Sequence, residues 1–395
     1  CIRDRTNSFE RDNPKPNVWK YRDYVVQAMN QDKPYDQFIQ EQIAGDELDA
    51  VTEDSLTATA YYRLGIWDDE PADPQQALFD GYDDLVSTMG QGILGLTLNC
   101  ARCHDHKIDP ITQRDYYSLV AFIRDVTPYG TRGDQTGNNQ IDLDPDLAAR
   151  YQDLEILSKD LEKQKKKIEQ TAIRKMSAED QRATEGPARK KTLKSKLKQY
   201  VDAETFDRYQ AVSKRIAEIT AERRQLPPRR RVLGLARSEP QPPPTYVLLR
   251  GSPQAEGASV QPSFPRLLGG GRPDIPAAVE DQSSAGRRRI LAEWLTSDDN
   301  WMTARVIVNR LWLHYFGRGI VRSPNNFGLM GEPPTHPELI DYLATLLIEN
   351  DWHLKPIHRA LLPPQQPARI TRRPLIPIEH QIIASDKNIQ RRSFA

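Results

Sequence analysis

Cysteine is the scarcest feature of this sequence, with three residues in a chain of 395. Three cysteines cannot supply the disulfide framework of a small secreted domain. The chain also lacks any run of about 20 apolar residues, so it predicts no transmembrane segment. Glycine (21) is less frequent than proline (30), which predicts extended connections and irregular loops between short helices.

A surplus of charge of either sign is absent as well. The sequence has 55 basic and 55 acidic residues, and this balance gives no bulk attraction to nucleic acid or to an anionic membrane. We therefore predict no nucleic-acid partner. No N-terminal signal peptide is recognisable, and the chain begins with Cys1 rather than methionine, so we expect a truncated or frame-shifted fragment.

Two of the three cysteines lie together in residues 99–110, where they are three positions apart and are followed directly by a histidine. This C-x-x-C-H spacing is typical of c-type haem attachment. Two thiols on one turn of backbone can add to the two vinyl groups of one haem, and the imidazole that follows can bind the iron. The motif predicts haem c attached at Cys100 and Cys103, with His104 as the iron ligand.

Other chemistries suit the same residues. A C-x-x-C pair can act as a redox dithiol. Alternatively, Cys100, Cys103, His104, His106 and Asp109 can form a divalent-metal cluster, with Asp105 as a further oxygen donor. Such a site would suit a metal-dependent hydrolase or a structural role, although spacing alone nominates no catalytic residue. A purely structural role for the cysteines is the third reading.

Three-to-four-residue spacing of apolar side chains predicts helices in the first 125 residues. Asp73 and Pro74 mark the start of the strongest of them, with an N-cap followed by proline at the first helical position. We expect that helix to continue through Gly90, Gly92 and Gly95 into Cys100. The other expected helices cover residues 18–29, 35–44 and 115–125, with a short one within 51–70.

The middle of the chain changes character. Residues 146–226 are rich in Lys and Glu, and leucine and isoleucine recur at heptad-like intervals (Leu154, Leu157, Leu161 and Ile168, then Val212, Ile216, Ile219 and Leu226). This pattern predicts two long helices folded back as an antiparallel coiled-coil hairpin. Its charged face is a candidate surface for a protein partner.

The remaining segments complete a mainly α, multi-domain fold with few short strands. Residues 227–282 read as a Pro/Gly-rich connector with one strand at 245–251, residues 283–362 as a compact helical domain, and residues 363–395 as an irregular tail. Within the helical domain, residues 303–316 predict a helix that buries Tyr315. Thr335 and Glu338 have the spacing of a capping box for a helix over 337–350.

If haem binds, a second axial ligand is needed from elsewhere in the chain. Met89, Met302, Met330, His314 and His336 are the candidates that the sequence offers. A methionine in this position raises the reduction potential relative to a second histidine.

Several long motifs are similar to known families. Residues 1–145 resemble the planctomycete cytochrome-type domain, and residues 283–362 resemble the C-terminal domain that accompanies it in large bacterial extracytoplasmic proteins. The motifs that carry the resemblance are residues 95–111 (GLTLNCARCHDHKIDPI), 33–38, 41–46, 303–312 (TARVIVNRLW), 314–319 and 331–339 (GEPPTHPEL).

The resemblance implies covalent haem on Cys100 and Cys103, with His104 as iron ligand. It also implies a periplasmic or cell-surface location and electron transfer to an unknown redox partner, in a setting linked to polysaccharide breakdown. The similarity ends after His358 and Arg359, where a proline-rich stretch and a basic tail replace the expected continuation.

Overall fold

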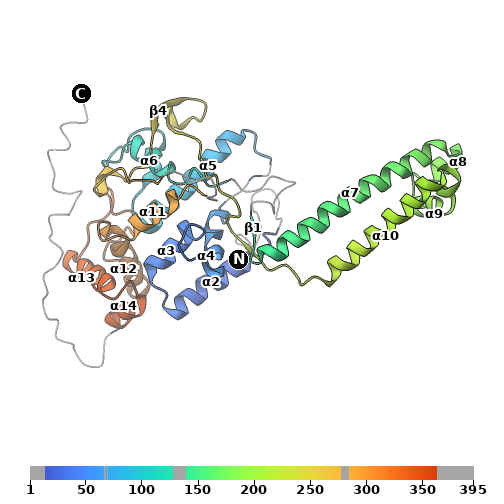
Figure 1. Ribbon diagram of the computed structural model, residues 1–395. Helices are drawn as coiled ribbons and strands as arrows, with labels where there is room; N and C mark the ends of the chain where they lie inside the picture. The colour runs from blue at the N-terminus through green and yellow to red at the C-terminus, as the bar shows by residue number, and fades with distance from the viewer. Residues whose placement is uncertain (1–13, 66–67, 69, 128–138, 277–283, 363–395) are drawn as a thin grey trace. The chain divides into compact units, whose positions relative to one another are not determined.

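The computed structural model describes residues 14–65, 68, 70–127, 139–276 and 284–362 (Figure 1). The chain forms two compact units, one made of residues 1–141 and 232–395 and the other of residues 142–231. The fold is mainly helical, as expected. Within the described ranges, no helix combines the length and the apolar character needed to cross a bilayer. The tail predicted at 363–395 lies outside the described residues.

The first unit begins with helices that pack into its core. They are α2 (Val18–Gln31), α3 (Tyr35–Ala44), α4 (Glu53–Ala58), α5 (Pro74–Met89) and α6 (Gln113–Val120). The predicted start of α5 is confirmed, because the Asp73 carboxylate accepts hydrogen bonds from the amides of Gln75 and Gln76, both at 3.0 Å.

The expectation that α5 runs on to Cys100 is wrong. After Met89 the backbone widens into one π-helical turn, Gly90–Leu94, and the turn ends at Gly95 with φ 64°. This left-handed conformation suits glycine and ends a helix. A separate 3₁₀ turn, Leu98–Arg102, carries the first cysteine. The glycines therefore redirect the chain rather than lie inside a continuous helix.

The C-terminal part of the same unit is a second group of helices, α11 (Arg287–Leu295), α12 (Trp301–Phe316), α13 (Pro337–Glu349) and α14 (Leu354–Leu361). Two local predictions fail here. The N-cap of α13 is His336, without a side-chain cap, because the Thr335 hydroxyl instead donates to the carbonyl of Ile320. Tyr315 is 40% exposed, since it lies on the last turn of α12, where the helix leaves the core.

The predicted strand in the connector is confirmed as β3 (Thr245–Leu248), which pairs antiparallel with β4 (Glu256–Val260). A second small sheet joins β1 (Gln140–Asp142) and β2 (Arg231–Leu233). The connector packs into the core through Phe264, whose ring stacks on Phe122 at 5.4 Å and on Trp294 at 4.6 Å between centroids. Such aromatic contacts stabilise beyond their buried area, so the connector holds the two helical groups together.

The second unit consists of α7 (Pro145–Lys175), α8 (Ala178–Ala183), α9 (Arg189–Tyr200) and α10 (Ala203–Gln225). The long helices α7 and α10 lie alongside each other (Figure 1). They run antiparallel, because Arg150 near the start of α7 pairs with Glu222 near the end of α10, while Gln164 meets Arg208 further along.

The apolar contacts of this unit differ in part from the expected heptad seam. Leu154, Ile168, Val212 and Ile219 are buried, but Leu157 is 38% exposed. The two helices are also not joined by a simple turn. The short helices α8 and α9 lie between them, and Leu193 and Leu197 form a small core with Ala172 and Met176. Coiled-coil packing of α7 on α10 stays a prediction.

Candidate functional site: the C-x-x-C-H loop

The two motif cysteines reach the surface from a backbone that is anchored beneath them. Leu98 and Ala101 on the same 3₁₀ turn are buried at 1% and 0% exposure, whereas Cys100 and Cys103 are exposed free thiols. One face of the turn thus belongs to the core and the other presents sulfur to solvent. Both thiols are accessible to an incoming group.

Arg102, between the cysteines, ties this turn to its neighbours. Its guanidinium contacts Asp80 of α5 at 2.6 Å, and its carbonyl accepts hydrogen bonds from Tyr117 (2.9 Å) and from the side chain of Gln113 (3.0 Å). Burial raises the pKa of Tyr117 to about 12, so the hydroxyl keeps the proton that it donates. The position of the cysteines is therefore set by contacts with α5 and α6.

The turn between β3 and β4 lies directly against the second cysteine. Gly251 has φ +72°, and a Cβ added there would lie 2.8 Å from the Cys103 sulfur. The same hairpin accepts a hydrogen bond from Gln113 at the carbonyl of Leu248 (3.1 Å). Only glycine leaves space for the sulfur here, since its lack of a side chain permits both the positive φ and the close approach.

The His104 ring is held by the backbone of the next residue. Its Nδ1 lies 2.6 Å from the backbone oxygen of Asp105. A carbonyl only accepts, so Nδ1 carries the proton and Nε2 keeps its lone pair. The side chain is exposed, which leaves Nε2 open. Metal-binding histidines commonly donate their other ring N–H to a carbonyl in this way. The loop thus presents two exposed thiols and one exposed imidazole whose Nδ1 is hydrogen-bonded.

The loop after His104 is fixed at the start of α6. The Asp105 carboxylate accepts a hydrogen bond from the amide of Gln113 at 2.8 Å, where the helix N-terminus favours negative charge. Thr112 and Asp115 form a capping box at the same helix end. This arrangement restrains residues 103–112, and with them His104.

His106, a residue of the alternative metal cluster, is committed to the loop. Its Nδ1 accepts hydrogen bonds from the amides of Ile108 (3.2 Å) and Asp109 (2.8 Å), so Nε2 carries the proton of the neutral ring. Nε2 lies 3.3 Å from the Thr97 hydroxyl. With Nδ1 accepting and Nε2 protonated, the ring offers no lone pair to a metal ion in this arrangement.

Asp109 is also occupied, in this case by a distant part of the chain. Its side chain is fully buried, and Oδ1 accepts a hydrogen bond from the amide of Leu329 at 2.7 Å. Oδ2 is buried without a hydrogen-bond partner and lies 3.7 Å from His106 Nε2. In the part of the chain that the structure describes, no three His, Cys, Asp or Glu side chains are placed to hold a metal ion. The structure does not assemble the alternative cluster.

Comparison with protein families gives two matches. Residues 1–128 match the PSCyt2 family model, a "Protein of unknown function (DUF1549)", and residues 287–365 match the PSD1 model, a "Protein of unknown function (DUF1553)". Both matches fit the planctomycete cytochrome-type domain and its C-terminal partner. No curated protein and no solved structure matches the chain.

The two matched regions meet at the motif. Gly95 of the PSCyt2 region accepts a hydrogen bond from the amide of Phe327 in the PSD1 region at 2.7 Å, and Asp109 binds Leu329 as described above. Nothing in the local sequence predicts these contacts, because the partners are more than 200 positions apart.

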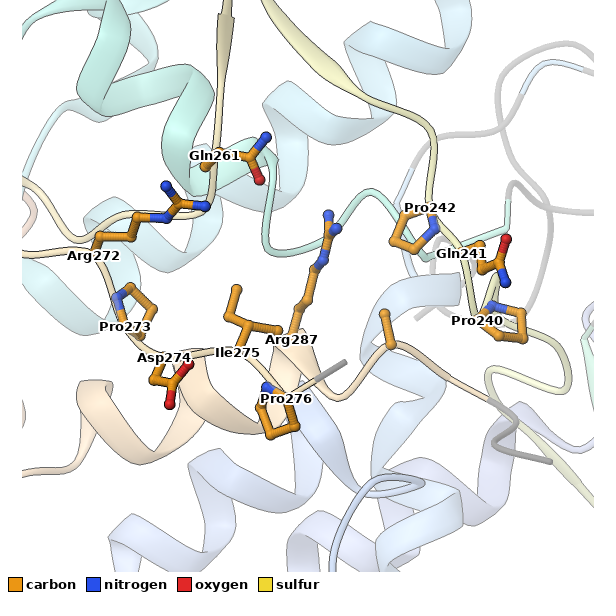
Figure 2. A pocket seen from close by; sticks show the side chains of 11 residues that line it. Pro240, Gln241, Pro242, Gln261, Arg272, Pro273, Asp274, Ile275, Pro276 and Arg287 are labelled. Atoms are coloured by element: carbon orange, nitrogen blue, oxygen red, sulfur yellow. The ribbon is translucent and has the colours of Figure 1, made fainter. Parts of the chain in front are cut away.

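A surface cavity lies elsewhere in the same unit. It has a volume of about 710 Å³ and is bordered by prolines of two segments, and Figure 2 shows the side chains of Arg272, Arg287 and Gln261 along it. A neighbouring cavity of about 560 Å³ is lined by Asp46, Glu47 and Glu293, among others. Neither cavity is lined by a residue of the C-x-x-C-H motif. The two exposed thiols of the motif lie outside both cavities.

Proposed function

We propose that this protein binds haem c covalently through Cys100 and Cys103, with His104 Nε2 as an axial ligand of the iron. One observation carries the proposal. The Nδ1 proton of His104 is held by the carbonyl of Asp105, which leaves Nε2 free and exposed beside two exposed thiols. The PSCyt2 match over the motif supports the same function.

The attachment needs no reagent beyond the reduced thiols. Each S–H adds across one vinyl group, so that a carbon–sulfur bond forms and the proton goes to the other vinyl carbon. Bound haem would supply one-electron chemistry, in which its reduction potential depends on the axial ligands and on the burial of the ring. We infer electron transfer in an extracytoplasmic setting linked to polysaccharide breakdown, in line with the resemblance of the sequence.

Within this function the residues around the motif keep the ligands in place. The Arg102 guanidinium and carbonyl fix the turn that carries the cysteines. Asp105 orients the imidazole with its carbonyl and binds the start of α6 with its carboxylate. These contacts reduce the freedom that the ligands would lose on binding, and such preorganisation favours affinity.

The test is to export the chain in a bacterial host that has cytochrome c maturation machinery and to record a pyridine haemochrome spectrum after acid–acetone extraction. We expect a c-type spectrum that survives extraction. Cys100→Ser and Cys103→Ser should each reduce covalent retention, and the double variant should abolish it. The matched control is Cys1→Ser, which removes the cysteine outside the motif and should retain the haem.

Unchanged haem retention in the double variant would contradict the proposal, as would extraction of all haem from the unmodified chain. In the latter case, the metal content of the purified protein, read by mass spectrometry, would test the divalent-metal alternative. A stoichiometric metal that is lost in His104→Ala would favour that alternative.

A further inference from the structure

A segment of the PSD1 region, residues 327–331, meets the motif and is held there through two of its backbone amides. The amide of Phe327 donates to the carbonyl of Gly95, and the amide of Leu329 donates to the Asp109 carboxylate, both at 2.7 Å. Gly95 lies five positions before Cys100, and Asp109 lies five positions after His104. The segment is thus fixed on both sides of the C-x-x-C-H sequence.

The fit at these contacts leaves no space for a side chain. A Cβ on Gly95 would lie 2.7 Å from the Phe327 ring, and a Cβ on Gly328 would lie 2.4 Å from the Asp109 carboxylate. Real Cβ atoms do not approach other atoms this closely. The two glycines therefore permit an approach of the PSD1 segment that larger residues would prevent.

The segment is also ordered by its own hydrogen bonds. The Ser323 hydroxyl donates to the carbonyl of Asn326 (2.6 Å) and accepts from the amide of Glu332 (2.8 Å). The amide of Gly331 donates to the carbonyl of Gly328 at 2.8 Å. That last bond closes the turn that carries Met330, so the backbone at Met330 is fixed by contacts within the segment.

Met330 itself is 70% exposed, although methionine is usually buried. Its neighbour Leu329 is 39% exposed, and Ile108, beside Asp109 in the motif loop, is 41% exposed. Large apolar side chains exposed together mark surfaces that bind something apolar. A haem attached at Cys100 and Cys103 would be an apolar group of this kind.

The other candidate ligands are less well placed. Met89 and Met302 are 4% and 3% exposed and belong to the hydrophobic core. His106 has no free lone pair, for the reason given above. His314 is on the last turn of α12 and His336 is the N-cap of α13, so neither lies in the segment that the contacts at Gly95 and Asp109 hold.

We propose that Met330 is the second axial ligand of the iron, supplied by the PSD1 region to a haem attached in the PSCyt2 region. The inference rests on the proposed function. It explains why a thioether is exposed on a turn that is fixed to both ends of the motif. His–Met ligation raises the reduction potential relative to bis-histidine ligation, so the haem of this protein would be a comparatively high-potential centre.

The test uses the full chain, loaded with haem as above, and compares it with Met330→Leu. We expect the ferric protein to have the weak far-red charge-transfer band of thioether-bound haem. Met330→Leu should lose this band and have a lower midpoint potential, with covalent haem retained. The control Met29→Leu changes a methionine of α2 that is 39% exposed and should keep both properties.

The outcomes separate the two proposals. Covalent haem without the far-red band, or a band that survives in Met330→Leu, overturns the role of Met330 and leaves the haem assignment intact. Absence of covalent haem overturns the proposed function and this inference with it.

Discussion

A buried charge cluster makes the stability of the first unit depend on pH. The guanidinium of Arg288, fully buried, contacts Asp46 at 2.6 Å and both Glu47 and Asp125 at 2.9 Å. One cation thus faces three carboxylates, of which Glu47 and Asp125 are buried as well. Burial raises the pKa of Glu47 from 4.5 to about 7, against the opposing effect of Arg288.

The sign of the effect follows from the difference between the folded and unfolded chains. Between pH 4.5 and about 7 the folded chain keeps a proton on Glu47 that the unfolded chain has lost, so the free energy of unfolding falls as the pH rises. At about 1.4 kcal/mol per pH unit, the loss over this window is on the order of 3 kcal/mol. Below pH 4.5, Glu47 is protonated in both the folded and the unfolded chain, so its contribution to stability is fully present. Above about pH 7 it is deprotonated in both, and that contribution is lost.

The measurement is urea unfolding between pH 4.5 and 7.5, followed by tryptophan fluorescence. All six tryptophans lie in residues 1–141 and 232–395, so the signal reports on the first unit alone. Glu47→Gln removes the titration and should flatten the pH profile, although it also weakens the hydrogen bond that the amide of Arg289 donates to the Glu47 carboxylate (2.7 Å). The control is Asp49→Asn on the same loop, where the side chain is 83% exposed.

Parallel pH profiles for the unmodified chain and Glu47→Gln would refute the reasoning. A profile that Asp49→Asn flattens equally would refute it too, because the effect would then not depend on burial.

Two further changes test how the first unit is held together. Arg288→Met should lower the free energy of unfolding by about 3–5 kcal/mol near pH 7, because it leaves three carboxylates without their cation. The measurement is urea unfolding, and a loss below about 1 kcal/mol would contradict this prediction. Gly95→Ala should lower the free energy of unfolding by about 1–3 kcal/mol, since its Cβ would meet the Phe327 ring at a φ of +64°. Gly81→Ala in α5 is the control, because no atom lies within 4 Å of its added Cβ. It should raise the free energy of unfolding by up to about 1 kcal/mol. Equal losses of stability in the two variants, measured by thermal melting, would count against the close approach of Phe327 to Gly95.

Short-range patterns predicted helix ends where the residues that start or stop the helix are adjacent to it in the sequence. The bounds of α3 follow from Pro34 and Gly45, and the start of α5 follows from Asp73 and Pro74, since these residues act on the adjacent backbone. The cap predicted at Thr335 failed because a distant partner competes with the local one. Thr335 has the spacing of a cap, but its hydroxyl is used by the carbonyl of Ile320, which lies 15 positions away. The glycines after Met89 suggested a costly continuous helix, whereas they form its end.

For the candidate site, the sequence determined which residue types are present and their spacing: two thiols, an imidazole directly after them, and the surrounding motif that matches PSCyt2. Covalent neighbours fix such spacing without any fold. The bonds that engage His104 and His106 also form within the loop, between residues one and three positions apart. Only the tertiary structure decided that Asp109 is buried against the amide of Leu329, 220 positions away. That contact depends on which donors and acceptors meet when distant segments pack, and no local pattern records it.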